Sequence, residues 1–288
     1  MTLEFFSATD VGRARDNNED SVAFDEATCT AVLADGMGGY NAGEVASNMA
    51  TTFIRTELGR WLREASAQAS DAEVRRAMDI CVDNANRAIF NAANSNPQYA
   101  GMGTTLVVAV FRGMQLLVGH IGDSRAYRWR EGELVQLTRD HSLLQEQIDA
   151  GLITPEQAAF SANKNLVTRA VGVEDTVLLE THQHDVQAGD VFLLCTDGVW
   201  EYVDDTQMEA SLAAAVGGDS LQIREHKVRG LFVEGLTETA VATADDEEFP
   251  PREVKVVGAD GGAGGDAAEL EIERMPAARE ADVALGAE

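Results

Sequence analysis

Two apolar segments that end in the same Asp-Gly pair constrain most strongly what this chain can fold into. Residues 31–36 read AVLADG and residues 193–198 read LLCTDG, so that each aspartate follows a run typical of a buried strand. A carboxylate at the end of such a strand is costly unless a partner stabilises its charge. The repetition therefore predicts that Asp35 and Asp197 face one shared site.

The order of the predicted elements indicates an α+β protein. Strand-like segments fill the first 35 residues, two long helical segments begin at Gly43 and after Ser70-Asp71, a good N-cap pair, and further strands begin near residue 104. The segments VAVFRGMQLLVG and AYRWREGELVQL are typical of antiparallel hairpins. Because strict βαβ alternation is missing, we expect a β-sandwich of two mainly antiparallel sheets flanked by helices, in α-β-β-α layers. Short helices are expected on either side of Thr154-Pro155, and another with Asp204 or Asp205 as its cap.

The strong negative charge limits the partners of the protein. The 288 residues carry a formal net charge of −27, which argues against nucleic acid because no cationic surface is evident to replace phosphate counterions. The three cysteines are too few for a disulfide framework and lack CxxC spacing. The chain shows neither a basic, apolar leader nor a run of the roughly 18 apolar residues that span a bilayer, so we expect a cytoplasmic protein without a membrane partner.

Further acidic residues at strand ends enlarge the candidate site. Asp123 follows QLLVGHIG, and Glu19 and Asp20 precede SVAFD. A single Asp-Gly pair is most often a turn, but several converging carboxylates repel one another unless cations lie between them. Such oxygen ligands suit magnesium or manganese. Gly36, directly after Asp35, could offer its backbone carbonyl to a cation.

An arginine near these residues could bind an anionic substrate. Arg15 lies four residues before Glu19, and a guanidinium group matches the oxygens of a phosphate. Arg13 points to the same face in a regular strand, so spacing alone does not single out Arg15. Either residue could equally be a solvated surface arginine.

Seven segments occur in an informative order along the chain: GRARDNNEDS, LADGMGGYNAGEVAS, GMGTTLVVAV, VGHIGDSRAYRWREGELVQLTRDHSLLQ, GLITPEQA, NLVTRAVG and AGDVFLLCTDGVWEYV. In this order they resemble the motifs of metal-dependent serine/threonine protein phosphatases of type 2C, most closely the small bacterial members. The resemblance runs from the N-terminus to about residue 215. It implies a β-sandwich flanked by helices, with a binuclear manganese or magnesium centre at one edge.

The resemblance also implies roles for individual residues. Asp35 would bridge two metal ions, and the Gly36 carbonyl would bind one of them. Glu19 would be a further ligand, and Asp20 would hold a metal-bound water. Asp197 would ligate the other ion.

Three more roles follow from the same resemblance. Asp123 would join Asp197 in holding a third, weaker ion. Arg15 would grip the substrate phosphate. Residues 143–165 would form a flap beside the site that bears on the choice of substrate.

The C-terminal part departs from the family pattern. In the family, a final Asp-Asn motif supplies another metal ligand, but no Asp-Asn follows residue 200 here. Asp245 or Asp246, before the strand-like EVKVV, is the nearest substitute. Three interpretations stay open: a divergent ligand, an unrelated extension that leaves one ion with fewer ligands, or the product of a changed reading frame that lacks the last strand.

These observations predict three regions in the chain. Residues 1–216 form the phosphatase domain, and residues 217–257 form a divergent segment that could complete the core. Residues 258–288 are an acidic, Gly/Ala-rich tail whose composition is typical of disorder.

We therefore expect an enzyme that hydrolyses phosphoserine and phosphothreonine in proteins by means of a metal-activated water. Its partners would be phosphorylated proteins and a cognate Ser/Thr kinase system, and we expect a monomer. The alternative is a catalytically impaired pseudophosphatase that binds phosphoproteins, because the Asp-Asn motif is missing.

Overall fold

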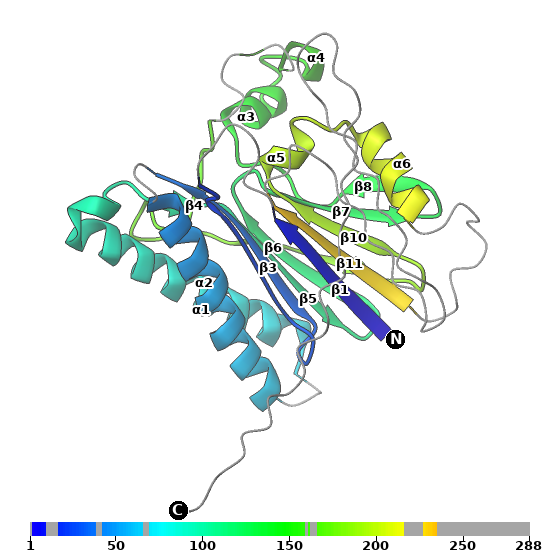
Figure 1. Ribbon diagram of the computed structural model, residues 1–288, viewed down its shortest axis with the longest axis horizontal. Coiled ribbons are helices and arrows are strands. Elements are labelled where there is room, and N and C mark those ends of the chain that lie inside the picture. The colour runs from blue at the N-terminus through cyan, green and yellow to red at the C-terminus, as the bar shows by residue number, and fades with distance from the viewer. Residues whose placement is uncertain are drawn as a thin grey trace, which may run out of the picture.

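The fold consists of two β-sheets packed face to face, with helices on both outer sides (Figure 1). The computed structural model describes residues 2–9, 17–38, 42–65, 69–158, 161, 166–215 and 227–234. This arrangement is the α+β sandwich that the order of sequence elements predicts.

The first sheet has six strands in the order β2-β3-β5-β6-β9, with β4 paired to the end of β3. All of its pairs are antiparallel. Its strands are β2 (Asp20–Asp25), β3 (Thr30–Met37), β4 (Gly103–Thr104), β5 (Leu106–Arg112), β6 (Gln115–Ile121) and β9 (Glu180–Asp185). The strands β3 and β5 are continuous buried runs because helices cover one face and the second sheet covers the other.

The second sheet has five strands in the order β1-β11-β10-β7-β8. They are β1 (Thr2–Thr9), β7 (Arg125–Arg130), β8 (Glu133–Gln136), β10 (Val191–Cys195) and β11 (Lys227–Glu234). The strand β11 runs parallel to both β1 and β10, whereas the other pairs are antiparallel. A strand from the region that departs from the family pattern therefore takes part in this sheet.

The apolar core between the two sheets contains interlocking aromatic rings. Phe111 of the first sheet meets Phe192 of the second edge to face, with ring centroids 5.3 Å apart. Phe5 of β1 stacks on Phe24 of β2 at 5.4 Å. These contacts fix how the two sheets lie against each other, and with them the sheet edge where the candidate site lies.

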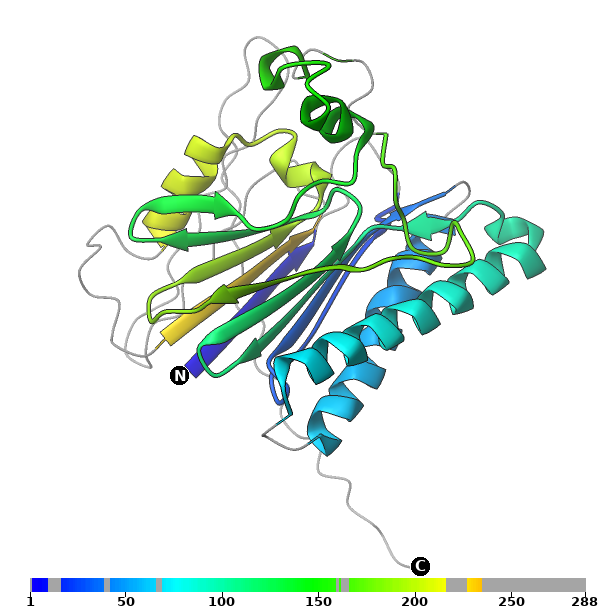
Figure 2. The ribbon, with the colours of Figure 1, turned by 180° about the vertical axis from the view of Figure 1, so that it is seen from behind.

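Two long helices, α1 (Ala42–Glu64) and α2 (Asp71–Ser95), cover the outer face of the six-stranded sheet (Figure 2). Ser70 caps α2 as predicted, and the Glu73 side chain accepts a hydrogen bond from the Ser70 amide at 2.7 Å. The first two turns of α1 bury only small residues, among them Gly43 and Ala46. The helix therefore approaches β3 closely at the end where the candidate site lies.

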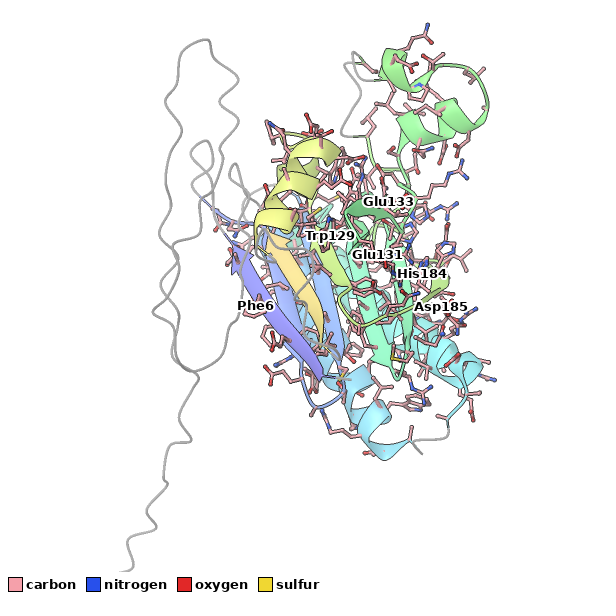
Figure 3. All side chains as sticks on the ribbon, turned by 90° about the vertical axis from the view of Figure 1, so that its right-hand side faces the viewer. Phe6, Trp129, Glu131, Glu133, His184 and Asp185 are labelled. Atoms are coloured by element: carbon pink, nitrogen blue, oxygen red, sulfur yellow. The ribbon has the colours of Figure 1, made fainter. Side chains whose placement is uncertain are left out.

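The outer face of the five-stranded sheet is covered by α6 (Asp205–Ala215), whose Met208 and Leu212 pack in one cluster with Phe6 and Trp129 (Figure 3). The cap of α6 is Asp204, which accepts from the amide of Gln207 at 2.8 Å. The remaining helices are short: η1 (Pro97–Tyr99), α3 (Leu143–Asp149), α4 (Pro155–Ala158) and α5 (Asp197–Trp200). Among the described helices, none is long and apolar enough to cross a membrane.

Candidate metal centre

The first half of the candidate site is a pair of aspartates on neighbouring strands. Asp20 begins β2 and lies directly opposite Asp35, near the end of β3. Both backbone groups of Asp35 are fixed: its amide donates to Thr105 Oγ1 at 3.0 Å, and its carbonyl accepts from Thr104 Oγ1 at 2.8 Å. The backbone that carries the Asp35 carboxylate is therefore held from the neighbouring strands.

The second half comes from the connection between the sheets and from the end of β10. Asp123 is buried in the turn that leads from β6 in the first sheet to β7 in the second. Asp197 is the first residue of α5, directly after β10. Thr196 Oγ1 donates to Asp20 Oδ2 at 3.0 Å, so the end of β10 is hydrogen-bonded to the start of β2.

The electrostatics show that these four carboxylates lie close together. Burial, and next the charges of Asp20 and Asp197, raise the pKa of Asp35 well above its ordinary value, and Asp123 adds to the effect. Burial, followed by the charges of Asp197 and Asp140, raises the pKa of Asp123 to about 7. Repulsion of this kind is relieved by a cation between the carboxylates.

Gly36 occupies a position where a side chain does not fit. A Cβ atom there would lie 2.1 Å from the carbonyl oxygen of Gly43 and 2.4 Å from that of Glu19. The Gly36 amide donates to the same Glu19 carbonyl at 3.0 Å. The end of β3, the approach to β2 and the start of α1 are thus in backbone contact beside Asp35.

The Glu19 carboxylate lies at the start of α1. A Cβ atom on Gly43 would be 2.6 Å from Glu19 Oε1 and 2.8 Å from the carbonyl carbon of Gly36. Glu19 and Gly36 therefore flank Gly43 on the side of α1 that faces the site. Ser47 Oγ donates to the Glu19 carbonyl at 2.6 Å and holds this segment against the helix.

The structure brings together Asp20, Asp35, Asp123 and Asp197, and it places Glu19 and Gly36 beside them. Arg15 and its neighbour Arg13, together with Asp245 and Asp246, lie outside the described residues. The donor set is made of oxygen atoms with an excess of negative charge, and it fits hard divalent cations such as Mg²⁺ and Mn²⁺.

A second polar cluster contains two buried histidines and a glutamate. Ligand atoms of His120, His141 and Glu180 lie within 4.8 Å of one another. The Gly122 amide donates to His141 Nδ1 at 3.1 Å, so the proton of the neutral ring is on Nε2, which lies 3.1 Å from Glu180 Oε2. Burial lowers the pKa values of both histidines, which keeps them neutral.

This second cluster fits a hydrogen-bond network better than a metal site. A metal on His141 Nε2 would displace its proton while Nδ1 still accepts from Gly122, which leaves the ring as an unfavourable imidazolate. His120 Nε2 lies 2.7 Å from the Arg139 carbonyl, another structural contact. Glu180 joins this network only through tertiary pairing, since it lies on β9, directly opposite His120 of β6.

Comparison with known proteins is consistent with this geometry. The family model described as protein phosphatase 2C matches residues 12–225. The serine/threonine phosphatase stp of Listeria monocytogenes is 38% identical over 215 residues, covering 74% of this chain and 83% of the relative. The serine/threonine protein phosphatase PstP of Mycobacterium tuberculosis is 34% identical over 283 residues, 97% of this chain and 52% of that protein.

Solved structures resemble the chain as well. A crystal structure of M. tuberculosis PstP has a TM-score of 0.64 and 37% identity, and the match covers 70% of this chain and 82% of the other. The catalytic domain of PstP in complex with two manganese ions has a TM-score of 0.60 at 37% identity, over 70% of this chain and 81% of that one.

Proposed function

The chain belongs to the protein phosphatase 2C family and is a metal-dependent protein serine/threonine phosphatase, and from this premise we propose that its acidic cluster is a binuclear Mn²⁺ or Mg²⁺ centre. In this proposal Asp35 would be the ligand common to both ions, and Glu19, the Gly36 carbonyl and Asp197 would complete their protein ligands. Asp20 would orient a water in the site. Asp123 and Asp197 together would hold a third, weaker ion.

The observation that carries this proposal is the position of Asp35. Its backbone is hydrogen-bonded on both sides, and its carboxylate lies in the repulsive field of Asp20, Asp197 and Asp123. A fold that keeps four like charges at one place pays a free-energy penalty, and divalent cations remove that penalty. When bound, such ions activate a water as nucleophile and neutralise charge on the phosphoryl oxygens.

The protein itself supplies position and substrate binding. The backbone contacts around Asp35 and Gly36 keep the ligands in place, so little reorganisation is needed during the reaction. The substrates are phosphoproteins, and within the proposal Arg15 binds the phosphate by its two-pronged guanidinium group. Residues 143–165, which include α3 and α4, form the flap beside the site, and a cognate Ser/Thr kinase system supplies the phosphoproteins to the monomeric enzyme.

One observation favours a second candidate. No Asp-Asn follows residue 200, so one ion could lack a protein ligand, and the chain would then bind phosphoproteins without efficient turnover. The acidic residues kept together at the sheet edge favour the enzyme, because a binding module has no need of four mutually repulsive carboxylates.

The decisive experiment measures hydrolysis of a phosphothreonine peptide with manganese, and again after chelation with EDTA. We expect turnover that requires the metal and that falls by on the order of a hundredfold or more in Asp35→Asn and Asp197→Asn, since even partners of metal ligands are worth 10–100-fold. The control is Glu133→Gln, an exposed carboxylate on β8 that should leave the rate unchanged. Full turnover in Asp35→Asn would contradict the metal centre.

The same experiment separates the two candidates. A folded wild-type chain that binds the peptide and Mn²⁺ without releasing phosphate would support the binding module. Arg15→Ala should mainly raise KM for the phosphopeptide, because it removes a contact to the substrate phosphate and leaves the metal ligands in place.

A further inference from the structure

Arg125 makes an unusual set of contacts directly beside the acidic cluster. It is the first residue of β7, two positions after Asp123. Its Nε donates to Asp140 Oδ1 at 3.0 Å and its Nη2 to Asp140 Oδ2 at 2.7 Å, while Nη1 donates to the Tyr127 hydroxyl at 3.0 Å. Only 19% of the Arg125 side chain and 7% of the Asp140 side chain are exposed, so this forked ion pair is shielded from water.

The same guanidinium group also contacts the helix that carries Asp197. Its central carbon lies 3.7 Å from the ring centroid of Trp200, within the range of a cation–π contact. Trp200 is the last residue of α5 and Asp197 is the first. A four-residue helix is short, so an anchor at one end constrains the other.

Asp140 lies in a segment that binds the Asp123 turn along its length. The His141 amide donates to the Gly122 carbonyl at 2.9 Å, and the Ala126 amide donates to Thr138 Oγ1 at 3.1 Å. Arg125 therefore connects this supporting segment, through Asp140, with α5, through Trp200. Asp123 lies two residues before Arg125 in the chain and is therefore next to this connection.

We propose that Arg125 is a positioning residue that holds the carboxylates of Asp123 and Asp197 at a fixed separation by pairing with Asp140 and stacking on Trp200. The inference rests on the proposed function of the acidic cluster as a metal centre. It adds a residue that would touch neither metal nor substrate and that sets the geometry of the two ligands of the third ion, one of which, Asp197, would also hold the second ion.

The sign of the effect separates positioning from simple electrostatics. A positive charge beside a cation site opposes cation binding, so its removal would tighten metal binding if charge were the only effect. Positioning predicts the opposite, because the carboxylates lose their fixed separation. Arg125→Lys keeps the charge but loses the planar fork and much of the stacking surface, so it tests geometry at constant charge.

The chain provides a matched control on the same strand. Arg130 ends β7 and makes an equivalent forked pair, with Nε to Asp190 Oδ1 at 2.6 Å and Nη2 to Asp190 Oδ2 at 2.7 Å. Five strand residues place it about 17 Å from Arg125. Arg130→Lys should therefore disturb a similar ion pair without reaching the acidic cluster.

The test is calorimetric titration of Mn²⁺ into the metal-free full chain, for wild type, Arg125→Lys, Trp200→Leu and Arg130→Lys. We expect Kd to rise at least tenfold in Arg125→Lys and several-fold in Trp200→Leu, in line with the 10–100-fold known for residues that orient metal ligands. Arg130→Lys should stay within twofold of wild type. Thermal unfolding in EDTA shows whether each variant is folded. If Arg125→Lys does not fold, the test rests on Trp200→Leu, which leaves the Arg125–Asp140 pair intact.

Three outcomes overturn the inference. Wild-type affinity or tighter binding in the folded Arg125 variant, or in Trp200→Leu if that variant carries the test, would show that Arg125 does not set the ligand geometry. Equal weakening in Arg130→Lys would show a general loss of stability. Failure of the wild type itself to bind Mn²⁺ would overturn the proposed metal centre and the inference with it. The wild-type titration therefore distinguishes failure of the proposed function from failure of the inference about Arg125.

Discussion

Replacement of Asp123 by asparagine should stabilise the metal-free protein and reduce its stabilisation by metal. Asp123 is 3% exposed, and its pKa is raised to about 7, first by burial and then by Asp197 and Asp140. An aspartate in the unfolded chain titrates near 3.9, and each unit of difference is worth about 1.4 kcal/mol. The raised pKa therefore costs the folded state about 4 kcal/mol at pH 8, where the carboxylate is ionised, and about 1.5 kcal/mol at pH 5, where folding requires it to bind a proton.

The sign follows from proton binding. Between the two pKa values the folded protein binds more protons than the unfolded chain, so the free energy of unfolding falls as pH rises from about 4 to about 7. Below that window Asp123 is protonated in both states and imposes no penalty. Asparagine does not titrate, so the variant should lose this pH dependence.

The assay is urea unfolding of wild type and Asp123→Asn at pH 5 and pH 8, in EDTA and in Mn²⁺. In EDTA the advantage of the variant should grow by about 2.5 kcal/mol from pH 5 to pH 8. In Mn²⁺ the wild type should gain stability and the variant should gain less. A difference between the two proteins that is independent of pH in EDTA would refute the reasoning, and Glu133→Gln is the control for an exposed carboxylate.

Three other predictions concern the surroundings of the site. Gly36→Ala should lower the free energy of unfolding in urea by about 3 kcal/mol, because the alanine Cβ would lie 2.1 Å from the Gly43 carbonyl oxygen. A variant as stable as wild type would contradict that contact. Ser70→Ala should cost about 1 kcal/mol by loss of the α2 cap while Kd for Mn²⁺ is unchanged, and weakened metal binding would show an unexpected link to the site. Asn86→Ala should cost about 1–3 kcal/mol in thermal unfolding, because buried Asn86 accepts from the Gly172 amide at 2.6 Å and that amide would lose its partner. An unchanged Tm in Asn86→Ala would mean that water or a backbone shift satisfies the amide.

The sequence was most informative where local chemistry and strand periodicity agree. The Asp-Gly pairs at residues 35 and 197 end apolar runs that could only be buried strands, and their convergence in the structure follows from the packing of two sheets. The hairpin through Gly113 and the Ser70 cap were predicted for similar reasons, since turn and cap residues act over a few positions. The metal-ligand roles themselves stay predictions.

Other features could not be inferred because they depend on long-range pairing. Nothing in the local sequence around Arg125 indicates that its partner is Asp140 rather than another of the many acidic residues, or that Trp200 lies on its other side. The place of β11 between β1 and β10 could not be predicted either, because local sequence does not indicate which strands pair with it. Side-chain pattern identifies an element more readily than its place in a sheet.

The parallel pairing of β1 with β11 has a consequence for synthesis of the chain on the ribosome. Thr2 lies opposite Lys227, so the first strand to be made waits for nearly the whole domain before its partner is available. Closing so long a loop is entropically costly and slows folding. The hairpin strands β2, β3, β5 and β6, with the two long helices, can assemble early from local contacts. The strand β1 lacks its partner β11 until translation passes residue 234, and this interval is when a nascent chain would most need a chaperone.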